Sequence, residues 1–118
     1  MNGDGEMGGA AAEDWRELCA LDDLSDDGTG RSFELGSLFV AAFRVGAEVH
    51  VIADACPHAG ASLGQGVLSR GEVTCPAHAL HFDLCTGHSS DGEGEQVRVW
   101  PVRVTRGRVF VQARAAAN

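Results

Sequence analysis

The alternation of apolar and polar residues along this chain is typical of short β-strands. The segments SLFVAAFRV and AEVHVI flank Gly46 and predict one β-hairpin. The segments VRVWPVRV and RVFVQ flank Thr105-Arg106-Gly107 and predict another, while WRELCAL predicts an edge strand that enters the fold. The 3.6-residue apolar period of an amphipathic helix is absent. The pattern therefore predicts an all-β domain of short antiparallel strands.

Two features interrupt the pattern. The valines of VRVWPVRV fall on odd positions before Trp100-Pro101 and on even positions after it. Proline inside a strand is confined to edges and bulges, so we predict a bulge or kink at this pair. The glycine-rich stretch 54–96 is poor in strand signals. Long irregular segments in a compact domain are usually functional, which directs attention to this stretch.

The length and the ends of the chain predict one domain with a tail. The 118 residues have room for a single domain. The first fourteen residues hold four glycines and four acids without an apolar period. We therefore expect a disordered acidic, glycine-rich tail over 1–13 and one domain over 14–114.

The net charge of −8 excludes the usual nucleic-acid binders, because such a surface repels phosphates. No apolar run approaches the roughly 18–20 residues that span a bilayer, so we expect no membrane association. The N-terminus has no basic stretch followed by an apolar one, so we expect a cytoplasmic protein. Thiols stay reduced there, and four cysteines then favour metal chemistry over disulfides.

Four residues in the irregular stretch form a candidate metal site. Cys56 and His58 follow the pattern C-x-H, and Cys75 and His78 follow the pattern C-x-x-H. Thiolates and neutral imidazoles are ligands of soft and borderline metals. A structural zinc ion would accept this Cys₂His₂ set. Zinc modules usually pair like ligands, however, whereas each segment here supplies one sulfur and one nitrogen. That arrangement suits a two-iron cluster.

The string CPH…G…L…G…CPAH…FDL.TG resembles the Rieske [2Fe-2S] signature over 56–87, and the flanking strands are compatible with that domain. The resemblance implies a small antiparallel β-sandwich or barrel. It also implies a cluster-binding subdomain of two loops, at about 54–90, with one [2Fe-2S] cluster per chain.

The resemblance further assigns Cys56 and Cys75 to an inner iron and His58 and His78 to an outer iron nearest solvent. An oxidised [2Fe-2S] core is doubly positive, so two thiolates neutralise it, whereas four would make it negative. Adding an electron is easier to the neutral site, so histidine ligation raises the reduction potential. The glycines in 60–66 would let backbone N–H groups approach the cluster sulfides.

The residues between the ligands distinguish two branches of Rieske proteins. The quinol-oxidising branch resembles CTHLGC…CPCHGS.YD, with a disulfide between the loops and with serine and tyrosine hydroxyls near the cluster. This chain has Ala61 and Ala77 at the disulfide positions and Leu80 and Phe82 at the hydroxyl positions. Fewer donors to the sulfurs predict a potential at the low end of the Rieske span of about −150 to +300 mV.

The resemblance to soluble Rieske ferredoxins implies a one-electron carrier between a flavin-dependent reductase and a terminal oxygenase or reductase, with transient docking. An acidic carrier suits a partner with a basic docking face. The alternatives are the small subunit of an NAD(P)H-dependent nitrite reductase and a zinc-stabilised module without redox function. The sequence shows no nucleophile–base pair and no open metal position. We therefore expect an electron-transfer component and not an enzyme by itself.

Several other residues invite a functional interpretation, but a structural one is simpler. We expect Cys19 to be a core residue and Cys85 to be a small apolar filler beside the FDL turn, with no disulfide between them. We expect the remaining histidines to be solvent-exposed polar residues and the tryptophans to be core or edge cover: His50, His81, His88, Trp15 and Trp100.

Overall fold

The computed structural model describes residues 15–56, 61–77, 80–89 and 95–112. The tail predicted over 1–13 lies outside them. Within the described residues the helical segments are two 3₁₀ turns, η1 Leu21–Asp23 and η2 Leu63–Gln65, so the all-β prediction is confirmed. The strands are β1 Trp15–Ala20, β2 Arg31–Leu35, β3 Leu38–Val45, β4 Glu48–Ala53, β5 Val67–Ser69, β6 Glu72–Thr74, β7 His81–Asp83, β8 Val99–Trp100, β9 Val102–Thr105 and β10 Arg108–Gln112.

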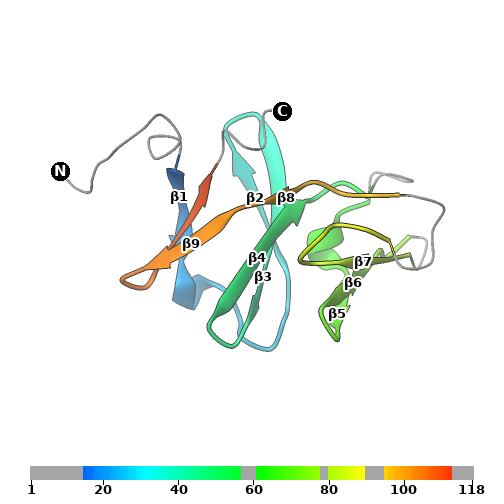
Figure 1. Cartoon of the computed structure of the whole chain (residues 1–118), viewed down its shortest axis with the longest axis horizontal. Coiled ribbons are helices and arrows are strands. Elements are labelled where there is room, and N and C mark those ends of the chain that lie inside the picture. The colour runs from blue at the N-terminus through cyan, green and yellow to red at the C-terminus, as the bar shows by residue number, and fades with distance from the viewer. Residues whose placement is uncertain (1–14, 57–60, 78–79, 90–94, 113–118) are drawn as a thin grey trace.

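Two antiparallel sheets form a sandwich, which we call the basal sandwich (Figure 1). One sheet has the order β1-β10-β9 and the other β2-β3-β4-β8. The first hydrophobic core lies between them and draws on alternate residues of both, such as Val49 and Val51 of β4 and Val109 and Val111 of β10. The prediction that the first strand is an edge strand is confirmed, because among the described strands β1 pairs with β10 alone.

A third sheet, β5-β6-β7, lies at one end of the molecule (Figure 1). It covers a second core, to which the β3–β4 hairpin contributes its other face through Ala41, Phe43 and Ile52. This hairpin is therefore buried on both faces, which explains why its central run is continuously apolar. We call the part of the chain from 54 to 98 the small lobe, because it leaves the sandwich after β4 and returns at β8.

The phase change at Trp100-Pro101 marks a crossing between the two sheets of the sandwich. Trp100 pairs with Val51 in one sheet, and the next strand residue, Val102, pairs with Val111 in the other. The Pro101 carbonyl oxygen accepts a hydrogen bond from the Gln112 N–H at 3.1 Å. The predicted kink is confirmed, and its physical role is to let one segment serve both sheets.

The two predicted hairpins are confirmed, whereas the hairpins β2–β3 and β5–β6 were not predicted. The turn between β9 and β10 places Arg106 and Gly107 at φ +54° and +75°. The turn between β5 and β6 places Arg70 and Gly71 at φ +55° and +78°. Positive φ at both central residues is the requirement of a type I′ turn. The stretch 54–96, which was expected to be irregular, thus contains three short strands.

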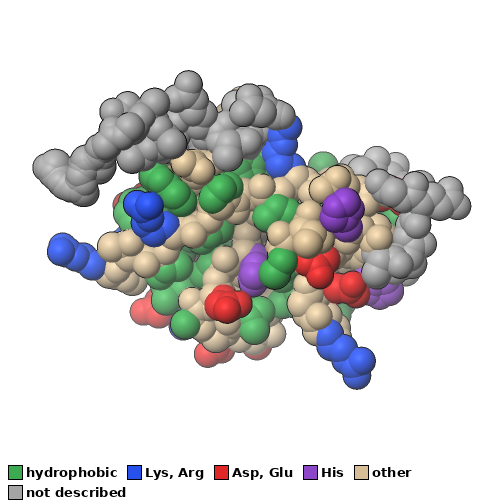
Figure 2. Space-filling model, in the orientation of Figure 1, with side chains coloured by type: hydrophobic (Ala, Val, Ile, Leu, Met, Phe, Trp, Pro, Cys, Tyr) green, Lys and Arg blue, Asp and Glu red, His purple; other side chains and the backbone are tan. Residues whose placement is uncertain are grey.

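The surface of the described residues mixes charges of both signs. Figure 2 shows arginine and acidic side chains interspersed over one face, with histidine side chains both in the middle of that face and toward the end that carries the small sheet. No helix in the described part of the chain is long and apolar enough to cross a membrane.

Candidate metal centre

The first cysteine of the predicted ligand set begins a loop that the backbone closes. Ala55 forms a bridge with Ser62 just after β4 ends. Inside this bridge, the Cys56 N–H donates to the Ala61 carbonyl oxygen at 2.8 Å. Cys56 itself is only 2% exposed. His58 lies between these residues, outside the described part of the chain, so its position stays a prediction.

The second cysteine begins a loop that the backbone closes in the same way. Thr74 pairs with His81 where β6 gives way to β7, and the Cys75 N–H donates to the Leu80 carbonyl oxygen at 2.8 Å. Cys75 is 1% exposed. His78 again lies outside the described residues. The two loops therefore share one spacing, 55 to 62 and 74 to 81, with each cysteine immediately inside the closing pair.

Both cysteines belong to the second hydrophobic core. The other members of this core include apolar side chains from the β3–β4 hairpin, from η2, from the third sheet and the turn after it, and from the segment before β8: Phe43, Ile52, Leu63, Val73, Phe82, Leu84 and Val97. A thiolate is costly in such surroundings unless a metal compensates its charge. Two buried sulfurs at the bases of two equivalent loops fit a metal cluster that takes its inner ligands from the protein core.

The described residues alone do not complete a metal site. Within residues 15–56, 61–77, 80–89 and 95–112, no group of three histidine, cysteine, aspartate or glutamate side chains could hold a metal ion. Of the predicted ligands, Cys56 and Cys75 are described, and His58 and His78 are not. The set of four therefore stays a prediction.

The FDL-x-TG string forms the floor beneath the second loop. Phe82 is fully buried in the second core. Asp83 Oδ1 accepts hydrogen bonds from the N–H groups of Cys85 at 2.7 Å and Thr86 at 3.0 Å. The Gly87 N–H donates to the Asp83 carbonyl oxygen at 2.7 Å. Asp83 thus stabilises the turn with its side chain and its backbone together.

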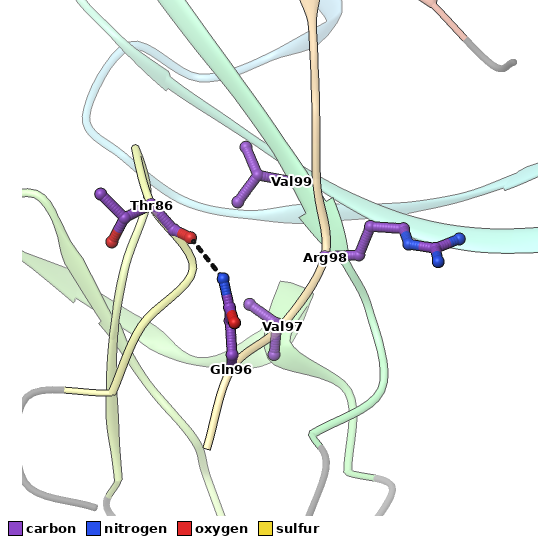
Figure 3. Close-up of a pocket in the computed structure, with 5 residues that line it drawn as sticks. All are labelled: Thr86, Gln96, Val97, Arg98 and Val99. Atoms are coloured by element: carbon purple, nitrogen blue, oxygen red, sulfur yellow. Dashed lines mark hydrogen bonds between the residues drawn. The ribbon is translucent and has the colours of Figure 1, made fainter. Parts of the chain in front are cut away.

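Gly87 packs this turn against the segment that leads to β8. Its φ is +80°, and a Cβ added there would collide with the Val97 carbonyl oxygen. The Val97 N–H donates to the Gly87 carbonyl oxygen at 2.8 Å. A surface groove of about 460 Å³ lies beside this contact between the turn and the segment (Figure 3). In it, Gln96 Nε2 donates to the Thr86 carbonyl oxygen at 3.4 Å. The side chain of Arg98 points away from this contact (Figure 3).

The four positions that distinguish the branches of Rieske proteins are all described. Ala61 is half-buried and Ala77 is exposed. Leu80 packs against the second core that contains Phe82 and both cysteines. The surroundings of the cysteine pair are therefore apolar where the other branch carries hydroxyl groups.

Two glycines between the loops have packing roles that the sequence analysis did not foresee. A Cβ at Gly64 would collide with Ser32 Oγ on β2, and a Cβ at Gly66 would collide with the Thr74 carbonyl oxygen on β6. These close approaches require glycine whether or not a cluster is bound. The proposed approach of backbone N–H groups to cluster sulfides stays a prediction.

One of the two remaining cysteines differs from its expected role. Cys19 lies in the first core as expected, and burial, with a smaller contribution from the Asp23 carboxylate, raises the pKa of its thiol. Cys85 was expected to be an apolar filler, and this was wrong, because the side chain is exposed. Leu84 takes the buried position of the turn, and Cys85 contributes its backbone N–H to Asp83. Both cysteines are thiols without a disulfide.

The histidines were expected to be exposed and the tryptophans to cover the core or an edge, and this holds for some of them. His88 is exposed as expected, whereas His81 is half-buried within β7. The His50 side chain is 21% exposed and lies on β4 between buried valines, so it is more enclosed than expected. Trp15 is covered by Arg103 at 4.4 Å from the ring centroid, and Trp100 is a core residue, 4% exposed.

Comparison with known proteins places this geometry in a family. The model of the Rieske-like [2Fe-2S] domain matches residues 14–112. The human protein named apoptosis-inducing factor 3 is 37% identical over 97 residues, which are 81% of this chain and 16% of that protein. This chain therefore corresponds to a small part of that relative.

Other relatives match over nearly their whole length. The anthranilate 1,2-dioxygenase ferredoxin subunit of Burkholderia cepacia is 34% identical over 103 residues, 86% of this chain and 94% of that protein. Among solved structures, the ferredoxin of carbazole 1,9a-dioxygenase from Nocardioides aromaticivorans IC177 has a TM-score of 0.77 and 30% identity, covering 82% of this chain and 95% of that one. A protein described as an NADH-dependent nitrite reductase small subunit from Mycobacterium tuberculosis has a TM-score of 0.75 and 33% identity, covering 82% and 92%.

Proposed function

The chain belongs to the Rieske-like [2Fe-2S] domain family, and we propose that it carries single electrons from a flavin-dependent reductase to a terminal oxygenase or another oxidoreductase. The observation that carries this proposal is the pair of buried cysteines at the bases of two loops that the backbone closes in the same way. Relatives that match over nearly their whole length are named as ferredoxin components of dioxygenases. The chain is accordingly an electron-transfer component and not a catalyst by itself.

The cofactor is a Rieske-type [2Fe-2S] cluster, and we assign four ligands to it. Cys56 and Cys75 would supply thiolates to the inner iron, and His58 and His78 would supply imidazoles to the outer iron. The burial of both cysteines supports their inner position. When bound, the cluster accepts and releases one electron. The apolar core around the two sulfurs would shield the cysteine side of this group from solvent.

The environment of the cysteine pair supports a low reduction potential. Leu80 and Phe82 carry no hydroxyl group, so they cannot donate hydrogen bonds that would stabilise the reduced state. We expect a midpoint potential in the lower part of the Rieske span of about −150 to +300 mV. A redox titration that gives a midpoint potential above roughly +100 mV would contradict this explanation of a low potential by the missing hydroxyl groups.

Anaerobic purification followed by visible absorption, EPR and metal analysis tests the cluster assignment. We expect a coloured protein whose dithionite-reduced form gives an EPR signal, with two irons per chain. A colourless, EPR-silent protein with stoichiometric zinc would instead support the zinc-stabilised module, since a Cys₂His₂ set also satisfies tetrahedral zinc.

The solved nitrite reductase small subunit supports a second candidate function, that of a fixed subunit of an NAD(P)H-dependent reductase. A shuttle docks weakly over a small interface and dissociates between turnovers. A fixed subunit stays bound during purification. Affinity purification of the tagged chain from its own source at moderate salt distinguishes them: a stoichiometric reductase in the eluate supports the subunit, and isolation of the chain alone supports the shuttle.

A further inference from the structure

The residue two positions before the first cysteine accepts an unusual number of hydrogen bonds. Asp54 Oδ1 accepts from Ser32 Oγ at 2.9 Å, from Ser62 Oγ at 2.9 Å and from the Gly64 N–H at 3.0 Å. The two serine oxygens lie 3.0 Å apart. Because each hydroxyl has one proton, donation by both serines to the carboxylate uses both protons at one acceptor. Hydrogen bonds to a charged acceptor are the stronger kind.

Two of these donors come from the C-terminal side of the first loop, and the third comes from the basal sandwich. Ser32 lies on β2 of the sandwich, and Ser62 closes the first loop through its bridge with Ala55. The backbone of Asp54 adds to the junction, because its carbonyl oxygen accepts from the Leu63 N–H at 2.6 Å. One carboxylate therefore joins the two ends of the first loop to each other and to the sandwich. We call this set of contacts the Asp54 junction.

The sequence around the junction is constrained to make this approach possible. A Cβ at Gly64 would collide with Ser32 Oγ and would lie 3.1 Å from Asp54 Oδ1. A Cβ at Gly30 would lie 2.6 Å from the Gly64 carbonyl oxygen. Real Cβ atoms do not tolerate such contacts with backbone, so η2 can lie this close to β2 only with glycine at these positions.

Another aspartate with a similar local pattern provides a contrast. Asp27 Oδ1 accepts from Ser25 Oγ at 2.7 Å and from the Thr29 N–H at 2.9 Å. Hydrogen bonds from Thr29 and then from Ser25 lower the pKa of Asp27 to about 2. All these partners lie within one loop of the sandwich. Asp27 thus stabilises its own turn, whereas Asp54 connects segments that are far apart in the sequence.

We propose that Asp54 is a positioning residue for the cluster, which holds the first loop, and with it Cys56, in fixed register with the basal sandwich. This proposal rests on the cluster assignment above. The Cys56 N–H bond to Ala61 closes the loop only if Ala55 and Ser62 stay paired, and Asp54 is hydrogen-bonded to Ser62 directly. Without the junction, the first loop keeps its ligands but loses the framework that sets their distance from Cys75.

The test compares Asp54→Ala, Asp54→Asn and the matched control Asp27→Ala in the purified holoprotein. The rate of cluster loss to an iron chelator is followed by visible absorbance, and the EPR line shape of the reduced cluster is recorded. Losing hydrogen bonds to a charged acceptor shifts the equilibrium between the closed and the open first loop by about tenfold or more. We therefore expect D54A to lose its cluster about tenfold faster than the parent protein and to give a broadened EPR signal. Asparagine keeps an Oδ1 acceptor, and D54N should stay within about threefold of the parent protein.

The control separates positioning from general stability. Asp27→Ala should lower the melting temperature but leave the rate of cluster loss and the EPR line shape unchanged. Equal rates of cluster loss in D54A and the parent protein would overturn the proposal, as would equal acceleration in D27A. If D54A does not fold, Ser32→Ala removes a single arm of the junction, and the proposal then requires faster cluster loss in S32A than in D27A.

Amide hydrogen exchange at Gly64 keeps this test independent of the cluster assignment. The Gly64 N–H should exchange faster in Asp54→Asn than in the parent protein, because the neutral amide is a weaker acceptor. A parent protein that binds no [2Fe-2S] cluster would end the proposed function, and the exchange result would still decide whether the junction exists. Unchanged exchange in a cluster-containing protein would end the positioning proposal alone.

Discussion

A substitution at Gly87 tests how closely the turn beneath the second loop packs against the segment that leads to β8. Replacing it with alanine at φ +80° introduces the left-handed strain of about 1 kcal/mol that any alanine would have there. The added methyl group also meets the Val97 carbonyl oxygen and lies 3.0 Å from Val99 Cγ2. Overpacking of this kind costs about 1–3 kcal/mol, so the total for Gly87→Ala is about 2–4 kcal/mol.

Gly107→Ala is the matched control, because Gly107 has a similar φ of +75° and no atom within 4 Å of the added Cβ. It should cost only the strain, about 1 kcal/mol. For a domain of this size, 1 kcal/mol lowers the melting temperature by about 4–8 °C. Thermal unfolding followed by far-UV circular dichroism should therefore show a shift for G87A that is at least twice the shift for G107A. Equal shifts would refute the close approach of Gly87 to Val97.

Three further results follow from the site and its surroundings. Cys56→Ala and Cys75→Ala should each abolish the visible absorption of the cluster, whereas Cys85→Ser, at an exposed turn position, should retain it; retention in either of the first two would exclude that residue as a ligand. His58→Cys should lower the midpoint potential, since a thiolate adds negative charge, and an unchanged potential would mean that His58 is not a ligand. The pKa of Asp27 is lowered from 3.8 to about 2, so its stabilisation is present above about pH 4 and is lost as the pH falls toward 2. Asp27→Asn should lower the melting temperature at pH 7, and the difference from the parent protein should shrink toward pH 2; a constant difference would contradict this linkage.

The longer hairpins could be predicted from sequence because their strands are long enough to show a pattern. The turn at Arg106-Gly107 was expected, and Arg70-Gly71 uses the same dipeptide in the same turn type. The strands beside Arg70-Gly71 have only three residues each, which is too short to show a period of two. Their pairing is decided by packing, since Val73 and Phe82 complete a core that begins on the distant β3–β4 hairpin. Sequence windows cannot show that tertiary contribution.

The candidate site was predictable where chemistry determines the residue type. The spacing of Cys56 and Cys75 was sufficient to propose them as ligands, and both are buried at the bases of equivalent loops. Asp54 was not singled out, because an aspartate after a strand resembles any solvated loop residue, and its partner Ser32 comes from another strand. The Asp-x-Cys spacing next to the first loop is the local signal that could have indicated it. Cys85 was misassigned because the neighbouring Leu84 already fills the apolar position.

The small lobe begins and ends at the same rung of a β-ladder. Ile52 pairs with Val99, and the Ala53 N–H donates to the Arg98 carbonyl oxygen at 2.9 Å. Since the entropy of closing a loop grows only slowly with its length, the strand pairing at this rung costs little more for a long lobe than for a short one. Changes in the length of the loops of the small lobe are therefore compatible with the same strand pairing between β4 and β8. Any such change must still keep Ala41, Phe43 and Ile52 covered by apolar side chains, because these three residues form the face of the sandwich on which the small lobe packs.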